Sequence, residues 1–224
     1  MRRLAPRRPA LAAAGVTLFA ATAVLVAAGS LTGADRYAVW HLMPWLGRAH
    51  HLSPLSALAL PQLRGSFAHS LLSLCTYPAA VLPSLLLVLL AAARLPAGHA
   101  VTWLGIWVAG NAVEVAGKAL VERPVIFTPF YDTPFGHSLP SGHTIRALVV
   151  AAALASAWRA GVLAFAWSAG VVVALVLLGD HTPSDVAAGV FVALALAGWV
   201  PPAAYATGSS TRPAIRSASA GSRP

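Results

Sequence analysis

The stretch VLAFAWSAGVVVALVLL, residues 162–178, contains no charged side chain and is typical of a helix that lies inside a bilayer. The rest of the chain has the same character: 58% of the residues are hydrophobic, only 9% are charged, and the mean hydropathy is +0.74. Such a composition leaves too little polar surface to cover a soluble globule. The chain is therefore predicted to be an integral membrane protein.

Five further apolar runs lie on either side of this stretch, at residues 10–28, 70–93, 100–119, 143–158 and 183–199. They predict an all-α fold, a polytopic membrane helix bundle with about six transmembrane helices. Several runs are short for a full span, so we expect polar residues at their ends to extend the helices. We expect one membrane domain over residues 1–205. The tail over residues 206–224 is rich in Ser, Gly, Pro and Arg and is predicted to be disordered.

The long connection over residues 31–69 carries Tyr37, Trp40 and Trp45, followed by Ser53-Pro54. Aromatic side chains favour the level of the lipid headgroups. The Ser-Pro pair resembles an N-cap with proline at the first helical position. We therefore expect short helices that lie along the membrane interface.

The charged residues divide unevenly between the two sides of this six-helix arrangement. One side has nine cations and no acid: Arg2, Arg3, Arg7, Arg8, Arg94, Arg159, Arg212, Arg216 and Arg223. The other side and its helix ends have the cations Arg36, Arg48, Arg64, Lys118, Arg123 and Arg146 and all the acids, Asp35, Glu114, Glu122, Asp132, Asp180 and Asp185. By the positive-inside rule, both termini and the C-terminal tail are predicted to be cytoplasmic.

The formal net charge of +9 is thus interpreted as a sign of topology in a multi-pass protein of the cell membrane, with some attraction to anionic lipid heads. Nucleic-acid binding is not expected. One alternative stays open for residues 1–29, which have the basic start and apolar run of a secretory signal. Its removal would leave the remaining topology unchanged, since the segment after it is external in both cases.

Three polar motifs stand between the apolar runs, at residues 118–124, at Pro140-Ser141-Gly142-His143 and at residues 181–185. In the predicted topology they lie on the external face, periplasmic or extracytoplasmic, at the ends of the third, fourth and sixth helices or in the loops that lead into them. Because ionisable residues at membrane level usually mark function, three such segments at one level predict an active site.

These blocks resemble those of the type 2 phosphatidic acid phosphatase and vanadium haloperoxidase superfamily, whose pattern is KxxxxxxRP, then PSGH, then SRxxxxxHxxxD. The second block is complete in this chain, as is the His-to-Asp half of the third, in the segment GDHTPSDVAAG at residues 179–189. The resemblance extends over about residues 100–200 and indicates the membrane lipid phosphatase branch of the superfamily.

The resemblance implies catalytic roles for His181, His143 and Asp185. His181 would attack phosphorus and form a phosphohistidine, while Asp185 would accept the other ring N–H and stabilise the positive charge. His143 would protonate the leaving oxygen and then activate water. The mechanism of the family needs no metal, and the sequence predicts neither a metal site nor a cofactor.

Four further residues are predicted to bind the phosphate. Ser141 and the backbone N–H of Gly142 stand at the start of a helix, where free donors and the helix dipole favour an anion. Lys118 and Arg123 would supply cations that neutralise the phosphate oxygens.

Each of these residues also has a structural interpretation. His143 by itself fits an interfacial histidine at a helix start. Asp185 fits a capping box in which Thr182 is the N-cap. Lys118 could simply pair with Glu114 one turn earlier. These roles are compatible with catalysis, and their coincidence on one membrane face favours the functional interpretation.

Two arginines of the family pattern are absent, since Val125 and Leu175 stand at their positions. Each lost guanidinium would remove about 1.5–3 kcal/mol of charge-assisted bonding to phosphate. Arg123-Pro124 would serve as the RP pair if the loop is shorter than usual. Arg146, one turn after His143, would be a replacement cation.

The sequence therefore predicts an integral membrane phosphatase whose substrate is a lipid phosphate or diphosphate, either an isoprenoid diphosphate or a phosphatidate-like lipid. The apolar tail of the substrate would enter between helices from the bilayer. The alternative is a catalytically weak or inactive relative that binds or transports lipid phosphates. Val125 and Leu175 favour the alternative, whereas the intact His143, His181 and Asp185 favour the enzyme.

Overall fold

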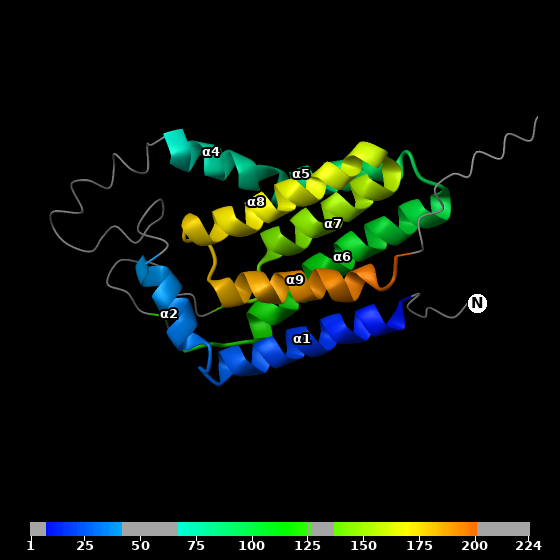
Figure 1. Ribbon diagram of the computed structural model, residues 1–224. Helices are drawn as coiled ribbons and strands as arrows, with labels where there is room; N and C mark the ends of the chain where they lie inside the picture. The colour runs from blue at the N-terminus through cyan, green and yellow to red at the C-terminus, as the bar shows by residue number, and fades with distance from the viewer. Residues whose placement is uncertain (1–7, 42–66, 125, 127–136, 201–224) are drawn as a thin grey trace, which may run out of the picture.

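The computed structural model describes residues 8–41, 67–124, 126 and 137–200, and every regular element within these ranges is a helix. In chain order, the elements are α1 (Pro9–Ala27), α2 (Thr32–His41), α4 (Phe67–Thr76), η2 (Tyr77–Ala79), α5 (Val81–Ala92), α6 (Ala97–Leu120), α7 (Gly142–Ala157), η3 (Arg159–Val162), α8 (Leu163–Leu177) and α9 (Pro183–Ala197). Figure 1 shows a bundle with α2 at one end, steeply inclined to α1. The predicted all-α fold is confirmed for this part of the chain.

Three helical stretches are long and apolar enough to cross a membrane: α1, α6 and the stretch that joins η3 to α8. The segments α4–η2 and α5 form a fourth if they are taken as one span, although they are bent by 55°. Helices α7 and α9 are apolar but shorter, with 16 and 15 residues. Length and composition thus support three or four of the predicted spans.

The apolar run at residues 70–93 is broken rather than continuous. Pro78 occupies one of the first positions of η2, and Ala80 has an extended backbone with ψ of 161° before α5 begins. Proline lacks an N–H group and interrupts the helical hydrogen bonds, which accounts for the break. At this break, the carbonyl of Ala79 accepts a hydrogen bond of 2.8 Å from Nε of Arg146, a residue next to the candidate site.

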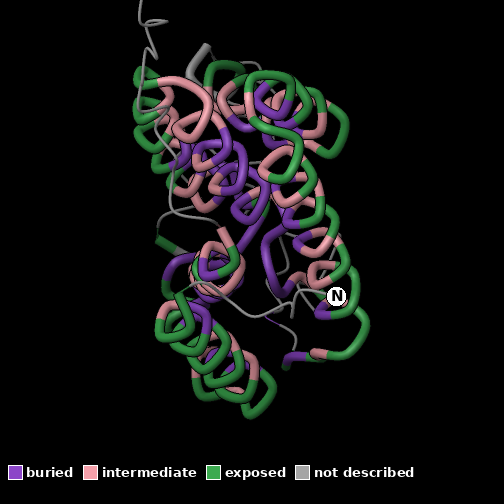
Figure 2. The backbone as a smooth tube through the Cα atoms, turned by 90° about the vertical axis from the view of Figure 1, so that its right-hand side faces the viewer, coloured by how far each residue is buried: buried purple, intermediate pink, exposed green. Residues whose placement is uncertain are grey.

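Helix α7 runs through the interior of the bundle and contacts α5, α6, α8 and α9. A core cluster that includes Trp103, Ile145 and Val149 joins α7 to its neighbours. Small residues such as Ala147 and Ala151 are fully buried on α7 and let these neighbours approach closely. Figure 2 shows the buried positions gathered inside the bundle and the exposed positions on its outer sides.

The start of α1 and the end of α9 lie together. The N–H of Arg8 donates to the carbonyl of Gly198 at 2.9 Å. Gly15 permits close packing here, because a β carbon at this position would be 2.3 Å from the backbone nitrogen of Ala195. Both described ends of the chain therefore lie at one end of the bundle, as the predicted topology requires. Which end is cytoplasmic stays a prediction.

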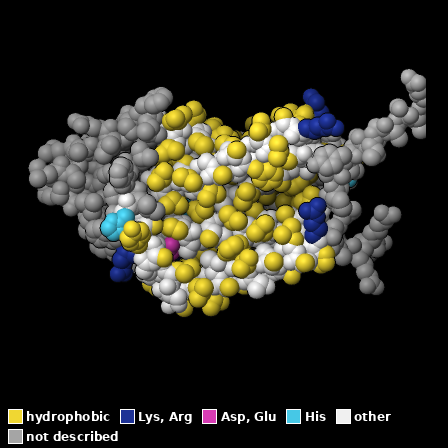
Figure 3. Space-filling model, viewed as in Figure 1, with side chains coloured by type: hydrophobic (Ala, Val, Ile, Leu, Met, Phe, Trp, Pro, Cys, Tyr) yellow, Lys and Arg dark blue, Asp and Glu magenta, His cyan; other side chains and the backbone are white. Residues whose placement is uncertain are grey.

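The outer surface of the helices is strongly apolar. Leu82, Leu86, Val101, Val115 and Leu163 are each at least 66% exposed. Figure 3 shows hydrophobic side chains across the middle of one face and Lys and Arg side chains near its ends. This distribution is expected where the middle of a protein faces lipid tails and its ends face the headgroups.

The predicted interfacial connection begins with α2, which packs against α9 rather than lying only along the membrane surface. Its residues Asp35, Ala38 and Val39 are buried, whereas Tyr37 is 63% exposed. Helix α2 thereby reaches the N-terminal end of α9. Trp45, Ser53-Pro54 and the predicted tail at residues 206–224 lie outside the described residues.

Candidate active site

The turn between α8 and α9 carries the third motif. Gly179 ends α8 with φ of 74°, a left-handed conformation that favours glycine. The carbonyl of Leu175 accepts the N–H groups of Asp180 at 3.0 Å and of His181 at 3.3 Å, which closes the turn. His181 is thus placed directly before α9, with its side chain 10% exposed.

Helix α9 begins with a capping box, so the structural interpretation of Asp185 is confirmed. Thr182 is the N-cap, and Pro183 follows in the first turn. The N–H of Thr182 donates to Oδ2 of Asp185 at 3.0 Å, and the N–H of Asp185 donates to Oγ1 of Thr182 at 3.4 Å. This box fixes the carboxylate of Asp185 one turn after His181.

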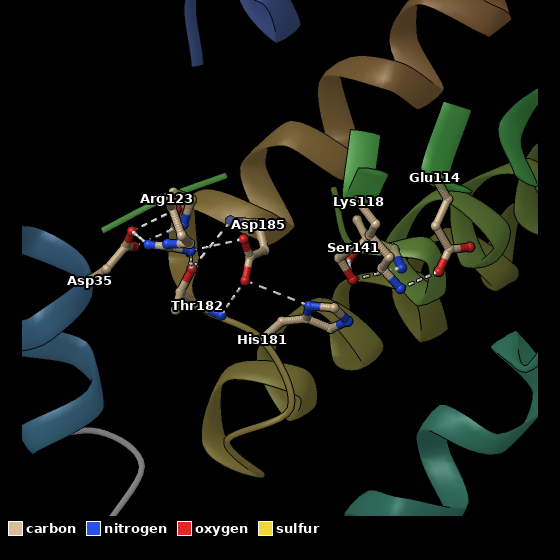
Figure 4. Close-up of polar contacts among 10 residues, drawn as sticks. Asp35, Glu114, Lys118, Arg123, Ser141, His181, Thr182 and Asp185 are labelled. Atoms are coloured by element: carbon tan, nitrogen blue, oxygen red, sulfur yellow. Dashed lines mark hydrogen bonds and ion pairs between the residues drawn. The ribbon is translucent and has the colours of Figure 1, made fainter. Parts of the chain in front are cut away.

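The same carboxylate faces the ring of His181 (Figure 4), with Oδ2 of Asp185 at 3.6 Å from Nδ1. This distance is longer than a hydrogen bond, and Nδ1 is buried without a hydrogen-bond partner. Because Nδ1 is turned toward Asp185, Nε2 is the ring nitrogen left for chemistry.

Arg123 is buried and holds Asp185 from another side. One terminal nitrogen of its guanidinium donates to Oδ1 of Asp185 and to Oγ1 of Thr182, both at 3.0 Å. The other donates to Oδ2 of Asp35, which lies on α2. The sequence predicted that Arg123 would bind phosphate, whereas these contacts direct its guanidinium at two carboxylates.

Asp35 is a candidate that the sequence motifs did not select. It lies ahead of the motif region and is 1% exposed. A buried acid in a membrane protein is rare and usually functional. The small number of acids in the chain, six, is the sequence signal that could have drawn attention to it.

The second motif forms the start of α7. Ser141 is the N-cap, and its fully buried hydroxyl oxygen accepts from the N–H of Thr144 at 3.4 Å. The N–H of Ser141 donates to the carbonyl of Asp185 at 2.9 Å, which ties the second motif to the third. The next N–H groups, of Gly142 and His143, belong to the helix start, where an α-helix has no intrahelical acceptor to offer them. This end of α7 is therefore suited to an anion.

Gly142 permits a close approach of α7 to Glu114, since a β carbon at this position would be 1.9 Å from Oε2 of Glu114. We predict that Gly142→Ala destabilises the protein by about 1–3 kcal/mol through overpacking. The measurement is the melting temperature in detergent. Gly105→Ala is the control, because its added β carbon has nothing within 4 Å and alanine favours a helix. Equal melting temperatures of the two variants would contradict the close contact.

Glu114 joins two cations at one edge of the site. Nζ of Lys118 is 2.7 Å from Oε1 of Glu114, which confirms the pairing that the sequence suggested. Arg146 donates to Oε2 of Glu114 and, at 2.9 Å, to Oδ1 of Asn111. Arg146 is 4% exposed, whereas the side chain of Lys118 is 37% exposed. Lys118 is thus the more accessible cation of a cluster that keeps a net positive charge.

The two histidines of the motifs belong to the same site. His143 is half-buried and lies two residues after Ser141, whose N–H donates to the carbonyl of Asp185, one turn after His181. Figure 4 shows His181 between the residues around Arg123 and the residues around Lys118. The fold therefore brings the three predicted motifs together from α6 and the segment after it, from α7 and from the start of α9.

The arginine that the family pattern places before the third motif is replaced by an apolar contact. Leu175 is 1% exposed and packs in a core cluster with Ala79, Ala147, Val171 and Val186. This position of α8 therefore contributes no cation to the site. The other substituted position, Val125, lies outside the described residues.

Comparisons with known proteins agree with this geometry. The model of the PAP2 superfamily matches residues 106–208, a range that contains all three motifs. The fold is similar to a structure described as the first transmembrane PAP2 type phosphatidylglycerolphosphate phosphatase from Bacillus subtilis, with a TM-score of 0.56 and 20% identity over 82% of this chain and 92% of that chain. No curated protein matches the chain. The motifs and the fold agree with this match, so residues 106–208 resemble the PAP2 superfamily.

Proposed function

We propose that the chain is an integral membrane phosphatase that hydrolyses a lipid phosphate or diphosphate at the outer membrane face. The observation that supports this most directly is the pair of His181 and the buried Asp185, 3.6 Å apart. A ring nitrogen that faces a buried carboxylate is the arrangement that a nucleophilic histidine requires. The PAP2 family match supports the same class of reaction.

In the first step, Nε2 of His181 attacks phosphorus, and a P–N bond forms as the P–O bond to the leaving group breaks. Asp185 lies on the Nδ1 side of the ring, where its negative charge stabilises the positive imidazole that results. His143 donates a proton to the leaving oxygen. The leaving group departs as an alcohol from a monophosphate, or as a lipid monophosphate from a diphosphate.

In the second step, the now neutral His143 takes a proton from a water molecule whose oxygen attacks phosphorus. The P–N bond breaks, and inorganic phosphate leaves. His181 is then free again and His143 carries its proton, so the site returns to its starting state.

The phosphate oxygens would be bound by the N–H groups of Gly142 and His143 and by the ammonium group of Lys118. Ser141 supports this end of α7 as its N-cap. In this arrangement Arg123 stabilises Asp185 rather than the phosphate, because its guanidinium already donates to carboxylates.

The test is phosphate release by the purified protein in detergent, with a chelator present. The substrates are isoprenyl diphosphate, isoprenyl phosphate, phosphatidate and phosphatidylglycerolphosphate. We expect release from at least one of them without added metal, since the proposed groups are side chains and backbone donors of the chain itself. Release that depends on a divalent cation would overturn this mechanism.

The alternative is a relative that binds or transports lipid phosphates with little or no hydrolysis. It is favoured by the apolar contact of Leu175 at the position of an arginine in the family pattern. Binding of a lipid phosphate by the folded protein, together with no release from any of the four substrates, would support it.

A further inference from the structure

We propose that Asp35 on α2 is a positioning residue for the nucleophile: it aligns Arg123 so that the guanidinium holds Asp185 against His181. This inference rests on the proposed role of His181. Asp35 lies outside residues 106–208, the range that the family model matches. The proposed role of Asp35 would thus add α2 to the helices that build the site.

The first argument is the shared guanidinium. Asp35 is 1% exposed, Arg123 is 4% exposed, and Asp185 is completely buried. One terminal nitrogen of Arg123 donates to Asp35 and the other to Asp185. Because a guanidinium is a rigid planar fork, a carboxylate that fixes one nitrogen also fixes the direction of the other.

The second argument is a direct contact with α9. Asp35 accepts the backbone N–H of Ser184 at 3.1 Å and its hydroxyl at 2.6 Å. Ser184 directly precedes Asp185, so Asp35 fixes the backbone that carries the carboxylate. A carboxylate at this place is also favoured by the dipole at the start of α9. One acid therefore holds both the guanidinium and the helix end.

The third argument is the charge of the buried network. Asp35 and Asp185 are negative and Arg123 is positive, so one negative charge is left without a buried counterion among these three groups. A buried net charge is unfavourable, and a positive imidazole beside it lowers the cost. Without Asp35, Arg123 would neutralise Asp185. With Asp35 present, the network keeps the negative charge that a phosphorylated His181 needs.

The experiment compares Asp35→Asn with Glu122→Gln, which removes a negative charge from an exposed residue next to Arg123. We expect Asp35→Asn to lower kcat about tenfold or more and to change KM by less than about threefold, because phosphate contacts are untouched. Glu122→Gln should retain the wild-type kcat. In an Arg123→Gln background, Asp35→Asn should cost less than it does alone, since the two residues act together.

A second measurement does not depend on turnover. The ¹⁵N NMR signal of Nδ1 of His181 is assigned by its loss in His181→Ala, and we expect Asp35→Asn to shift it while Glu122→Gln leaves it in place. Should Asp35→Asn fail to fold, Asp35→Glu is measured in the same way with the same expectations, because it keeps the charge but displaces the carboxylate.

The outcomes separate the two proposals. If the wild type releases phosphate and His181→Ala does not, while Asp35→Asn retains both the wild-type kcat and the Nδ1 signal, the proposed function stands and the role of Asp35 is overturned. If the wild type releases no phosphate from any substrate, the proposed function fails. An unshifted Nδ1 signal in Asp35→Asn then also overturns the role of Asp35, and a shifted signal supports it.

Discussion

Phosphate release is expected to fall by about a thousandfold or more when His181 is replaced by alanine, because the variant has no nitrogen to attack phosphorus. The groups proposed to bind phosphate, at the start of α7 and at Lys118, remain in place. Affinity for the lipid phosphate should therefore change little. The measurements are the initial rate of release and the labelling of the protein by a substrate with radioactive phosphate, which should give an acid-labile phosphohistidine only in the wild type.

The matched control is His41→Ala. His41 is exposed at the end of α2, where its ring packs against the ring of Tyr37. Its replacement should leave both the rate and the label unchanged. A His181→Ala protein that still accepts the label would show that another residue is the nucleophile.

The fold could be predicted from the sequence where the bilayer dictates it. The apolar runs located the helices, because a helix satisfies its own backbone groups inside lipid. The break at Pro78 was less apparent, since proline is tolerated in membrane helices when neighbouring groups satisfy the freed carbonyls. Here the carbonyl of Ala79, which stands four residues before Pro83, is bound by Arg146. That partner lies 67 positions further along the chain, beyond the reach of local patterns.

The same difference between local contacts and contacts that are distant in sequence applies to the site. The helix start at Ser141 and the capping box at Asp185 depend on neighbouring residues, so short motifs were enough to predict them. The contact between Arg123 and Asp35 could not be predicted in this way, because the two residues are 88 positions apart in the chain. Spacing along the chain identified Arg123 as a cation of the site but gave no means of choosing between a phosphate and a carboxylate as its ligand.

Asp185→Asn is expected to lower the rate of phosphate release on the order of a hundredfold, and it separates the two roles of this residue. The amide oxygen of asparagine can still accept the N–H of Thr182, so the cap at the start of α9 is largely retained. The negative charge that stabilises the positive ring of His181 is lost. Arg123 keeps Asp35 as its ion-pair partner, so no guanidinium is left unpaired in the interior.

Asp185→Ala provides the comparison, because it removes both the cap and the charge. We expect its melting temperature in detergent to be lower than that of Asp185→Asn, and its activity to be as low or lower. Capping by itself predicts a different pattern, in which Asp185→Asn has nearly the wild-type rate and only Asp185→Ala is impaired. That pattern would mean that the carboxylate serves the helix and that His181 is activated by another group. Rates and melting temperatures of the two variants, measured together, therefore decide whether Asp185 acts on the histidine or only on the fold.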